Sequence, residues 1–383
     1  MTTIEIVGAA FGNKGAQLML YAAAQHLRHA FGGVRVVVEP GTGTYEERAR
    51  YGLYQKMRER AYGRMGFLIE LLMHGGYRRK FGMVSEDEID AIIDVSGFAY
   101  GDLWGPEHME KRSAAVRRWK RRGKKIVILP QTFGPFVIPR VRQAALEILG
   151  SADLVFARDR TSYSHACGLG ITQVQMAPDI THLVSGIVPD CFSPPTPWSC
   201  VIPNHQMIRM GASDVRDQYH VFLVNVIQEL LARNLHPHVL QHEAKDDSAL
   251  VAELRSVFGD SVPVLREEDP VRVKGIIGTS FLVVASRFHG LLNALSQGVP
   301  ALATSWSHKY EELLEDYGCP HNLLSPDAPA PVIAAKLDEL HREPGRTTLV
   351  NTMCEAAAAQ RQKVSAMWSQ VDALLTGRVS GQH

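Results

Sequence analysis

Short apolar runs of strand length alternate with longer amphipathic runs of helix length along most of this chain. Such alternation is typical of parallel β-sheets whose two faces are covered by helices. Ligands of these sheets bind beyond the carboxyl ends of the strands, so residues that end strands and open helices are the candidates for function. The predicted strands are residues 4–7, 34–38, 91–95, 126–129, 154–157, 172–175, 200–203, 237–241, 262–265 and 281–286. The predicted helices are residues 16–29, 109–122, 139–149, 214–234, 247–258, 270–278 and 347–375.

A cluster of prolines interrupts this pattern near residue 190. Four prolines lie between residues 189 and 197, and neither a helix nor a central strand crosses such a run. We therefore predict two Rossmann-like domains, residues 1–190 and 198–345, and a terminal helix within 346–383 that packs across both. Two doubly wound domains that face a cleft, with a C-terminal helix crossing back, make an α/β fold that is GT-B-like.

The composition excludes several classes of protein. A length of 383 residues exceeds what one hydrophobic core usually supports, and 45% hydrophobic with 21% charged residues is ordinary for a globular enzyme. A formal net charge of +1 argues against a general nucleic-acid binder, which needs a large basic excess. Five scattered cysteines without a C-x-x-C pair, and an amino-terminus without the pattern of a signal peptide, predict reduced thiols and a cytoplasmic protein. We see no apolar run of membrane-spanning length.

One predicted strand ends at Ser286 and is followed by Arg287, Phe288, His289 and Gly290, after which a helical pattern begins. A tight turn from a buried strand into a helix presents backbone N–H groups to an anion. Arg287 adds a fixed positive fork, and His289 adds a group that exchanges a proton near pH 7. The turn is therefore a candidate for anion binding and proton transfer, although Arg and His in such turns also occur as plain surface residues.

Two turns in the first half also end predicted strands. Residues 8–16 form a glycine-rich turn that lets a ligand approach the backbone. Its spacing matches neither a dinucleotide fingerprint nor a P-loop, and a tight turn without a ligand is the alternative. Gln131 and Thr132 are held between two prolines and a glycine, and polar groups fixed in this way suit a substrate rich in hydroxyls.

Two further cations lie near strand ends. Arg158 follows the predicted strand at 154–157, and Asp159 or Ser162 can cap the helix that comes next. Lys309 is predicted to end another strand segment near the same cleft. Each cation taken alone is more often a surface residue, but three strand ends that each supply one are expected to converge around an anion.

The segments that carry these features are residues 12–15, 129–135, 157–159, 178–179, 286–290 and the stretch around Lys309. Their order and spacing resembles the polysaccharide pyruvyl transferase family. The likeness covers roughly residues 4 to 318, and its most specific parts are Arg-x-His-Gly and Pro-Gln-Thr-x-Gly-Pro. The chain departs from the family at Ala16, where Asp is common, and at residues 96–98, where Gly-Gly-Gly is frequent. Both departures lie in the half expected to bind the acceptor.

The resemblance implies transfer of pyruvate from phosphoenolpyruvate onto two hydroxyls of one sugar, which forms a cyclic ketal. The acceptor would belong to an exopolysaccharide or cell-wall polysaccharide, or to its lipid-linked oligosaccharide precursor. Phosphoenolpyruvate carries a carboxylate and a phosphate, so its site needs several fixed cations, and Arg287, Arg158 and Lys309 are expected to supply them. His289 would protonate the methylene carbon or the departing phosphate.

The expected catalytic residues are therefore His289 and Arg287. The sugar hydroxyls also need a base, for which His242, Asp246 and Asp179 are the candidates. The predicted substrate-binding residues are Asn13, Lys14, Gly15, Gln131, Thr132, Arg158, Asp179, His242, Gly290 and Lys309.

The scheme requires no cofactor besides phosphoenolpyruvate as co-substrate, and no metal. His236, His238 and His242 have ligand-like spacing, but no cysteine or carboxylate pattern completes a known set. Residues 111–125 are strongly basic and residues 64–80 contain an apolar helix with basic flanks, so both stretches could rest on anionic lipid at the inner face of a membrane. The alternative is an exposed solubilising helix beside a packed core helix.

Two other functions stay open at this point. A GT-B glycosyltransferase that uses a nucleotide sugar shares the architecture and the phosphate-binding turn. A carbohydrate-binding or scaffolding protein without catalysis agrees with Ala16 and Phe98.

Overall fold

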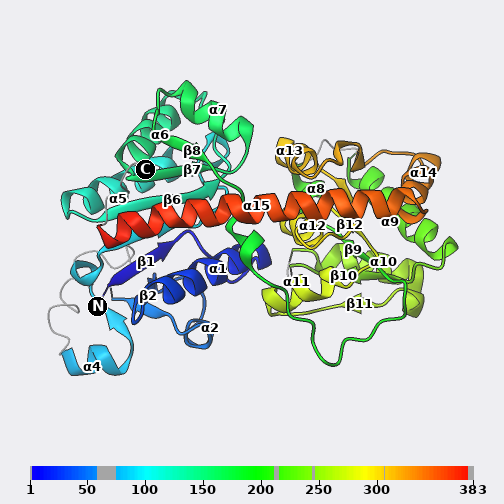
Figure 1. Ribbon diagram of the computed structural model, residues 1–383, viewed down its shortest axis with the longest axis horizontal. Coiled ribbons are helices and arrows are strands. Elements are labelled where there is room, and N and C mark those ends of the chain that lie inside the picture. The colour runs from blue at the N-terminus through cyan, green and yellow to red at the C-terminus, as the bar shows by residue number, and fades with distance from the viewer. Residues whose placement is uncertain (1, 58–74, 211–214, 244–245, 306, 378–383) are drawn as a thin grey trace. The chain divides into compact units, whose positions relative to one another are not determined.

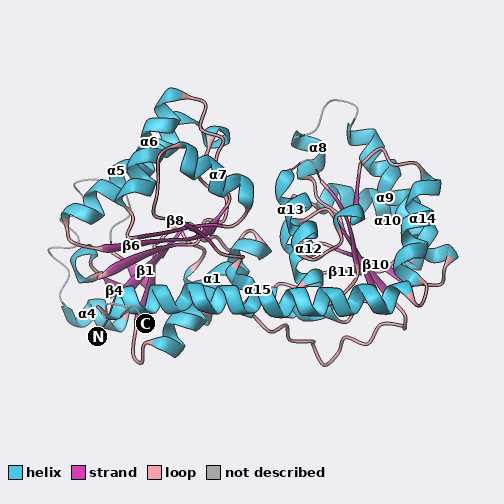
Figure 2. Cartoon of the chain, turned by 45° about the horizontal axis from the view of Figure 1, so that its top comes forward, coloured by secondary structure: helices cyan, strands magenta, loops and turns pink. Residues whose placement is uncertain are grey.

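The structure of the protein, a computed structural model, describes residues 2–57, 75–210, 215–243, 246–305 and 307–377. Its contacts divide the chain into two compact units. The first unit comprises Met1–Gly12, Ala16–Leu183 and Lys363–His383, and the second comprises Asn13–Gly15 and Val184–Gln362. In each unit a sheet lies between helices (Figures 1 and 2). The predicted α/β class with two parallel, doubly wound sheets is confirmed.

The first unit is built on a parallel sheet of eight described strands, in the order β4-β3-β2-β1-β5-β6-β7-β8. The order of the strands reverses between β1 and β5, so the turns after these two strands are where a ligand is expected. The strands are β1 (Thr3–Val7), β2 (Arg35–Val38), β3 (Tyr54–Lys56), β4 (Met83–Val84), β5 (Ala91–Asp94), β6 (Lys125–Gln131), β7 (Leu154–Ala157) and β8 (Val174–Met176). The α-helices described are α1 (Lys14–Ala30), α2 (Tyr45–Arg50), α4 (Gly75–Lys80), α5 (Gly105–Arg121), α6 (Pro139–Ser151) and α7 (Arg160–Gly168).

The second unit contains a parallel sheet of six described strands, in the order β11-β10-β9-β12-β13-β14. Its strand order reverses at β9, and two separate apolar clusters form its core. The strands are β9 (Ser199–Ile202), β10 (Pro237–Leu240), β11 (Val264–Leu265), β12 (Leu282–Ala285), β13 (Ala301–Thr304) and β14 (Leu323–Leu324). The helices are α8 (Gln206–Met210), α9 (Val215–Ala232), α10 (Ser248–Phe258), α11 (Pro270–Gly278), α12 (Phe288–Leu295), α13 (His308–Asp316) and α14 (Ala330–His341).

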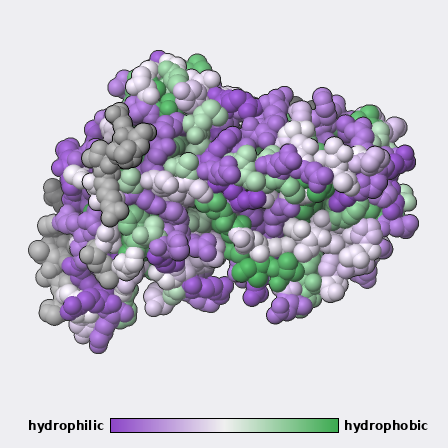
Figure 3. All heavy atoms as spheres, viewed as in Figure 1, coloured by the Kyte–Doolittle hydropathy of each residue, from purple (hydrophilic) through white to green (hydrophobic). Residues whose placement is uncertain are grey.

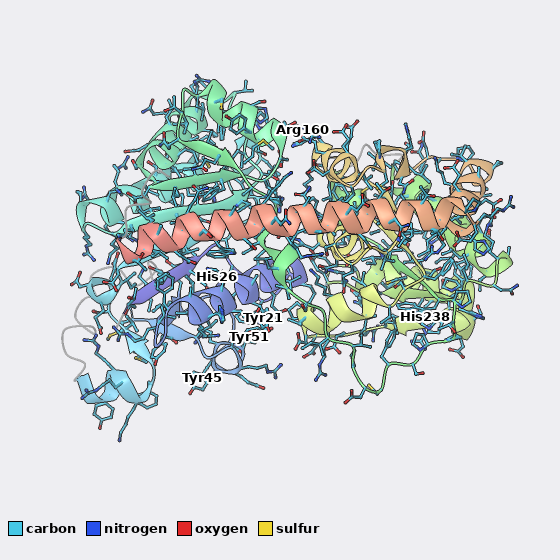
Figure 4. The ribbon with its side chains drawn as sticks, in the orientation of Figure 1. Tyr21, His26, Tyr45, Tyr51, Arg160 and His238 are labelled. Carbon is cyan, nitrogen blue, oxygen red and sulfur yellow. The ribbon has the colours of Figure 1, made fainter. Side chains whose placement is uncertain are left out.

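The last helix, α15 (Gly345–Thr376), contributes to both units. Its first part adds Met353 and Ala357 to the core of the second unit. In its last part Trp368 stacks on His26 of α1 at 3.9 Å between ring centroids, and a carboxylate oxygen of Asp372 lies 3.0 Å from Nε2 of the same imidazole. Figure 4 labels His26. The buried residues of α15 recur every three or four positions, so one face of the helix packs first in the second unit and then in the first; these residues are Met353, Ala357, Gln360, Val364, Met367, Trp368 and Val371.

Most predicted elements are present, and several short ones were not predicted. The strands β3, β4 and β14 have three, two and two residues, which is too short to produce a recognisable alternation in the sequence. The short helices α2, α4 and α8 were missed as well. The prediction that Lys309 ends a strand is wrong, because β13 ends at Thr304 and Lys309 lies in the first turn of α13.

Candidate active site

Arg287 precedes α12 in the second unit and is buried, and two carboxylates hold its guanidinium. Nη1 donates to Oε1 of Glu243 and Nη2 donates to Oδ1 of Asp247, both at 2.5 Å. Asp247 also accepts the backbone N–H groups of His205 and Glu243, each at 3.0 Å. The sequence predicts a fork that is open to an anion, whereas in the structure both terminal nitrogens face carboxylates.

One guanidinium between two carboxylates leaves an excess of negative charge at this point. Burial raises the pKa of Glu243, the charge of Arg287 opposes this shift, and the charges of Asp247 and the exposed Asp246 add to it. Of the two carboxylates that bind Arg287, Glu243 is therefore the one whose raised pKa favours the protonated form.

His242 comes directly before Glu243 and is 2% exposed. Neither Nδ1 nor Nε2 of His242 has a hydrogen-bond partner among the described residues. Burial lowers the pKa of His242 well below its usual value, and the charges of Arg287, His289 and Lys14 lower it further. The imidazole of His242 is thus neutral at pH 7 and lies close to the turn that opens α12.

The same turn holds His289 and Lys309. His289 lies in the first turn of α12, edge-on to Phe288, with 5.5 Å between the ring centroids. The Nζ of Lys309 lies 5.5 Å from the centroid of the Phe288 ring. Arg287 makes no capping hydrogen bond at the start of α12, so the positive end of the helix dipole adds to these cations.

Two glycines allow close packing at this site. A Cβ atom on Gly15 would lie 2.1 Å from Nδ1 of His289, and one on Gly290 would lie 2.9 Å from Cδ1 of Ile202. Gly15 belongs by its contacts to the second unit, as do Asn13 and Lys14. The missing side chain of Gly290 therefore lets α12 pack closely on Ile202 of β9, and that of Gly15 leaves room for the imidazole of His289.

Asn13 and Lys14 have polar partners in the second unit. Nδ2 of Asn13 donates to Oε1 of Glu243, and Nζ of Lys14 donates to the carbonyl of Glu268 at 2.5 Å. The structure thus brings together the predicted residues Asn13, Lys14, Gly15, His242, Arg287, His289, Gly290 and Lys309 within one unit. Asp246, the other candidate base of the second unit, is exposed.

Gln131, Thr132, Arg158 and Asp179 belong to the first unit, where Arg158 is the centre of a polar network. Its Nη1 donates to Oδ2 of Asp179 at 3.0 Å, and its Nη2 donates to Oγ1 of Thr132 at 2.9 Å. Oδ1 of Asp179 accepts two bonds from Thr181, at 2.7 and 3.0 Å, so both carboxylate oxygens already have donors. Asp159 caps α7 through the N–H of Ser162 at 2.8 Å, which confirms the predicted cap.

Sequence reasoning missed Asp94, which ends β5. Its carboxylate accepts bonds from Nε2 of Gln131 at 3.0 Å, from the hydroxyl of Ser96 at 2.6 Å and from the hydroxyl of Tyr100. Burial raises the pKa of Tyr100 well above its usual value, and the charge of Asp94 adds to this shift. The sequence does contain a signal for Asp94, because a carboxylate at the end of an apolar, buried strand needs several hydrogen-bond donors around it.

Sequence reasoning also missed a cavity of about 410 Å³ that lies wholly within the first unit. It opens at the turn after β1, next to the reversal of the strand order, and α5 forms another wall. Nε2 of His108 is buried there without a partner among the described residues, and burial, followed by the charge of Arg112, lowers the pKa of this imidazole. The polar side chains that line it are Glu39, Thr42, His108, Lys111 and Arg112, and Gly8 and Ala9 line it from the turn after β1.

The surface predicted to meet lipid is only partly described. Residues 64–74 of the apolar stretch lie outside the described residues. In the basic stretch Arg117, Lys120 and Arg122 form ion pairs with carboxylates of the same unit, which agrees with a solvated helix face. Hydrophilic residues, coloured purple in Figure 3, are spread over the face in view. None of the described helices combines the length and hydropathy needed to cross a bilayer.

Several solved structures share the fold of this chain. A Staphylococcus aureus MnaA–UDP co-structure matches with a TM-score of 0.64 at 13% identity, over 100% of this chain and 99% of its own. A putative UDP-N-acetylglucosamine 2-epimerase from Listeria monocytogenes matches with a TM-score of 0.60 at 11% identity, over 96% and 97%. The spinosyn forosaminyltransferase SpnP matches with a TM-score of 0.53 at 14% identity, over 98% and 99%. These likenesses confirm the GT-B-like fold and say nothing more, because the identities are low.

The sequence itself identifies the family. A model of the family described as polysaccharide pyruvyl transferase matches residues 13–308, which includes the turn at Arg287, the neutral His242 and the network around Arg158. With a match over most of its length, the chain belongs to the polysaccharide pyruvyl transferase family.

Proposed function

We propose that this protein transfers pyruvate from phosphoenolpyruvate onto two hydroxyls of a sugar and so forms a cyclic ketal. The observation that carries the proposal is the turn that opens α12, where His289 and Lys309 lie beside an amino-terminal helix end without a side-chain cap. A small donor with a carboxylate and a phosphate matches such a concentration of positive groups. Membership of the family supports the same reaction.

The reaction requires proton additions and proton losses that residues in and near this turn can carry out. A proton adds to the methylene carbon of phosphoenolpyruvate, and a sugar hydroxyl attacks the resulting cation at C2 and loses its own proton. The C2–O bond to phosphate then breaks, and a second hydroxyl closes the ketal as it loses its proton. His289 can deliver a proton to the carbon or to the departing phosphate. The imidazole of His242 is neutral and can therefore accept a proton, and its lowered pKa makes it a weak base that gives the proton up again readily.

We assign the acceptor sugar to the cavity of the first unit. Glu39 offers carboxylate oxygens there as acceptors, and Lys111 and Arg112 offer N–H donors, so the lining matches the hydroxyls and ring oxygen of a sugar. Nη1 of Arg112 also lies 3.6 Å from Oδ2 of Asp94, which holds this guanidinium in place. A partly exposed Trp104 lies 5.4 Å from the His108 ring, and aromatic faces pack well on the C–H face of a pyranose. A polymer precursor is the natural source of such an acceptor in this family.

Calorimetry and product analysis test the proposal. The protein should bind phosphoenolpyruvate and not UDP, and incubation with ¹³C-labelled phosphoenolpyruvate and a panel of oligosaccharide acceptors should release phosphate and add one pyruvate to an acceptor. Binding of UDP without binding of phosphoenolpyruvate would instead favour a glycosyltransferase that uses a nucleotide sugar. The scheme uses no metal, so turnover should survive EDTA, and a loss that Mg²⁺ restores would contradict it.

A further inference from the structure

The two carboxylates that hold Arg287 are not equivalent. Asp247 is 0% exposed, and its two oxygens accept one bond from Arg287 and two from backbone N–H groups. A carboxylate with this many donors in the protein interior is fixed in place. Asp247 therefore orients the guanidinium, and its three hydrogen bonds keep it bound there.

Glu243 is bound more weakly to its surroundings. Its Oε1 receives the bonds from Arg287 and from the side chain of Asn13, whereas its Oε2 makes no hydrogen bond to a described residue. Its side chain is 10% exposed, compared with 0% for Asp247. Glu243 is the partner that a competing anion can displace.

Charge also favours displacement of one carboxylate. When Asp247 and Glu243 are both ionised, their two negative charges exceed the one positive charge of Arg287. This excess would repel a donor that carries a phosphate and a carboxylate. If Glu243 is neutral, one positive charge and one negative charge remain, and Nη1 becomes available. The groups that act on Glu243 from its neighbours are Arg287, Asp247 and Asp246, and their balance with burial already shifts its pKa upward.

We infer that Glu243 is an exchangeable counter-ion of Arg287: an anionic oxygen of the donor replaces Glu243 at Nη1, and Glu243 takes up one proton from solvent. Asp247 stays bound to Nη2 throughout and acts as a positioning residue. This inference rests on the proposed function, because it takes phosphoenolpyruvate as the donor. It adds to that function that binding of the donor is coupled to the uptake of one proton by Glu243.

Titration calorimetry of phosphoenolpyruvate tests the exchange directly. Binding is measured in two buffers of equal pH but different ionisation enthalpy, without phosphate, so that the difference in heat gives the number of protons taken up. The wild-type protein should take up about one proton more than Glu243→Gln, which is neutral in both states. Glu243→Gln should bind phosphoenolpyruvate about tenfold more tightly above neutral pH, because no charge has to be removed.

Two further variants separate the possible results. Glu339→Gln changes an exposed glutamate of α14 in the same unit and should leave affinity and proton uptake as in the wild type. Asp247→Asn removes a charge that raises the pKa of Glu243 but leaves Glu243 as the exchangeable partner of Arg287, so this variant should still take up about one proton on binding. Equal proton uptake by the wild type and Glu243→Gln overturns the exchange while the proposed function stands. A wild-type protein that does not bind phosphoenolpyruvate overturns both.

Discussion

Gly15 and His289 are packed so closely that a Cβ atom on the glycine would lie 2.1 Å from Nδ1 of the imidazole. Because real Cβ contacts are never this short, Gly15→Ala must displace the His289 ring. A displacement of about 1 Å in a catalytic group costs about a hundredfold in rate. We therefore expect Gly15→Ala to lower kcat by about that factor, measured as phosphate release. Gly12→Ala is the matched control, since a Cβ at Gly12 meets nothing within 4 Å, and an equal loss in both variants would contradict this role.

His289 itself should matter for turnover more than for donor affinity. His289→Gln keeps a polar side chain of similar reach but removes the proton that the scheme requires. General acid catalysis contributes about 10²- to 10⁴-fold, so kcat should fall by that order while the Kd for phosphoenolpyruvate changes little. Single-turnover measurements check the first quantity and calorimetry the second. A variant that loses affinity and keeps its single-turnover rate would show that His289 binds the donor instead.

Removal of Arg287 should destabilise the second unit as well as weaken donor binding. Arg287→Ala leaves Glu243 and Asp247 buried without their positive partner, and breaking a buried ion pair costs about 3 to 5 kcal/mol of unfolding free energy. The double variant Arg287→Ala with Glu243→Gln should recover part of this loss, because only one unpaired charge remains. Urea denaturation measures both effects. No recovery in the double variant would mean that Glu243 carries no charge beside Arg287.

Much of the fold follows from the sequence, because β5, β6, β7, β9, β10 and β12 are largely apolar runs that end in polar turns. The site follows only in part. Arg287 is recognisable from its turn, but Glu243 and Asp247 precede it by 44 and 40 residues, and their contact depends on β10 and β12 flanking β9. No single-sequence pattern reveals that order of strands. For the same reason the sequence predicts an open cation where the structure has a paired one.

The cavity of the first unit gives a test of the acceptor side. Glu39→Gln should raise KM for the sugar acceptor about tenfold and leave the Kd for phosphoenolpyruvate unchanged, because Glu39 lines the cavity and has no part in the donor site. Initial rates at saturating donor measure the first quantity. Glu355→Gln, on the exposed side of α15, is the control and should behave as the wild type. A higher Kd for phosphoenolpyruvate in Glu39→Gln would place the donor, and not the acceptor, in the cavity.

The buried imidazole of His242 should make stability depend on pH. In the unfolded chain His242 takes up a proton near pH 6.5, whereas burial and the charges of Arg287, His289 and Lys14 keep it neutral in the folded protein at that pH. Unfolding therefore takes up a proton below about pH 6.5. Above that pH, His242 does not change the free energy of unfolding. As the pH falls below it, His242 lowers the free energy of unfolding, with a limiting slope of about 1.4 kcal/mol per pH unit. His242→Phe keeps a buried ring and removes the titration, so its unfolding free energy, from urea denaturation between pH 5 and 8, should vary less with pH than that of the wild type. The exposed His29→Gln should retain the wild-type dependence. Parallel curves for the wild type and His242→Phe would mean that His242 titrates equally in the folded and unfolded chains.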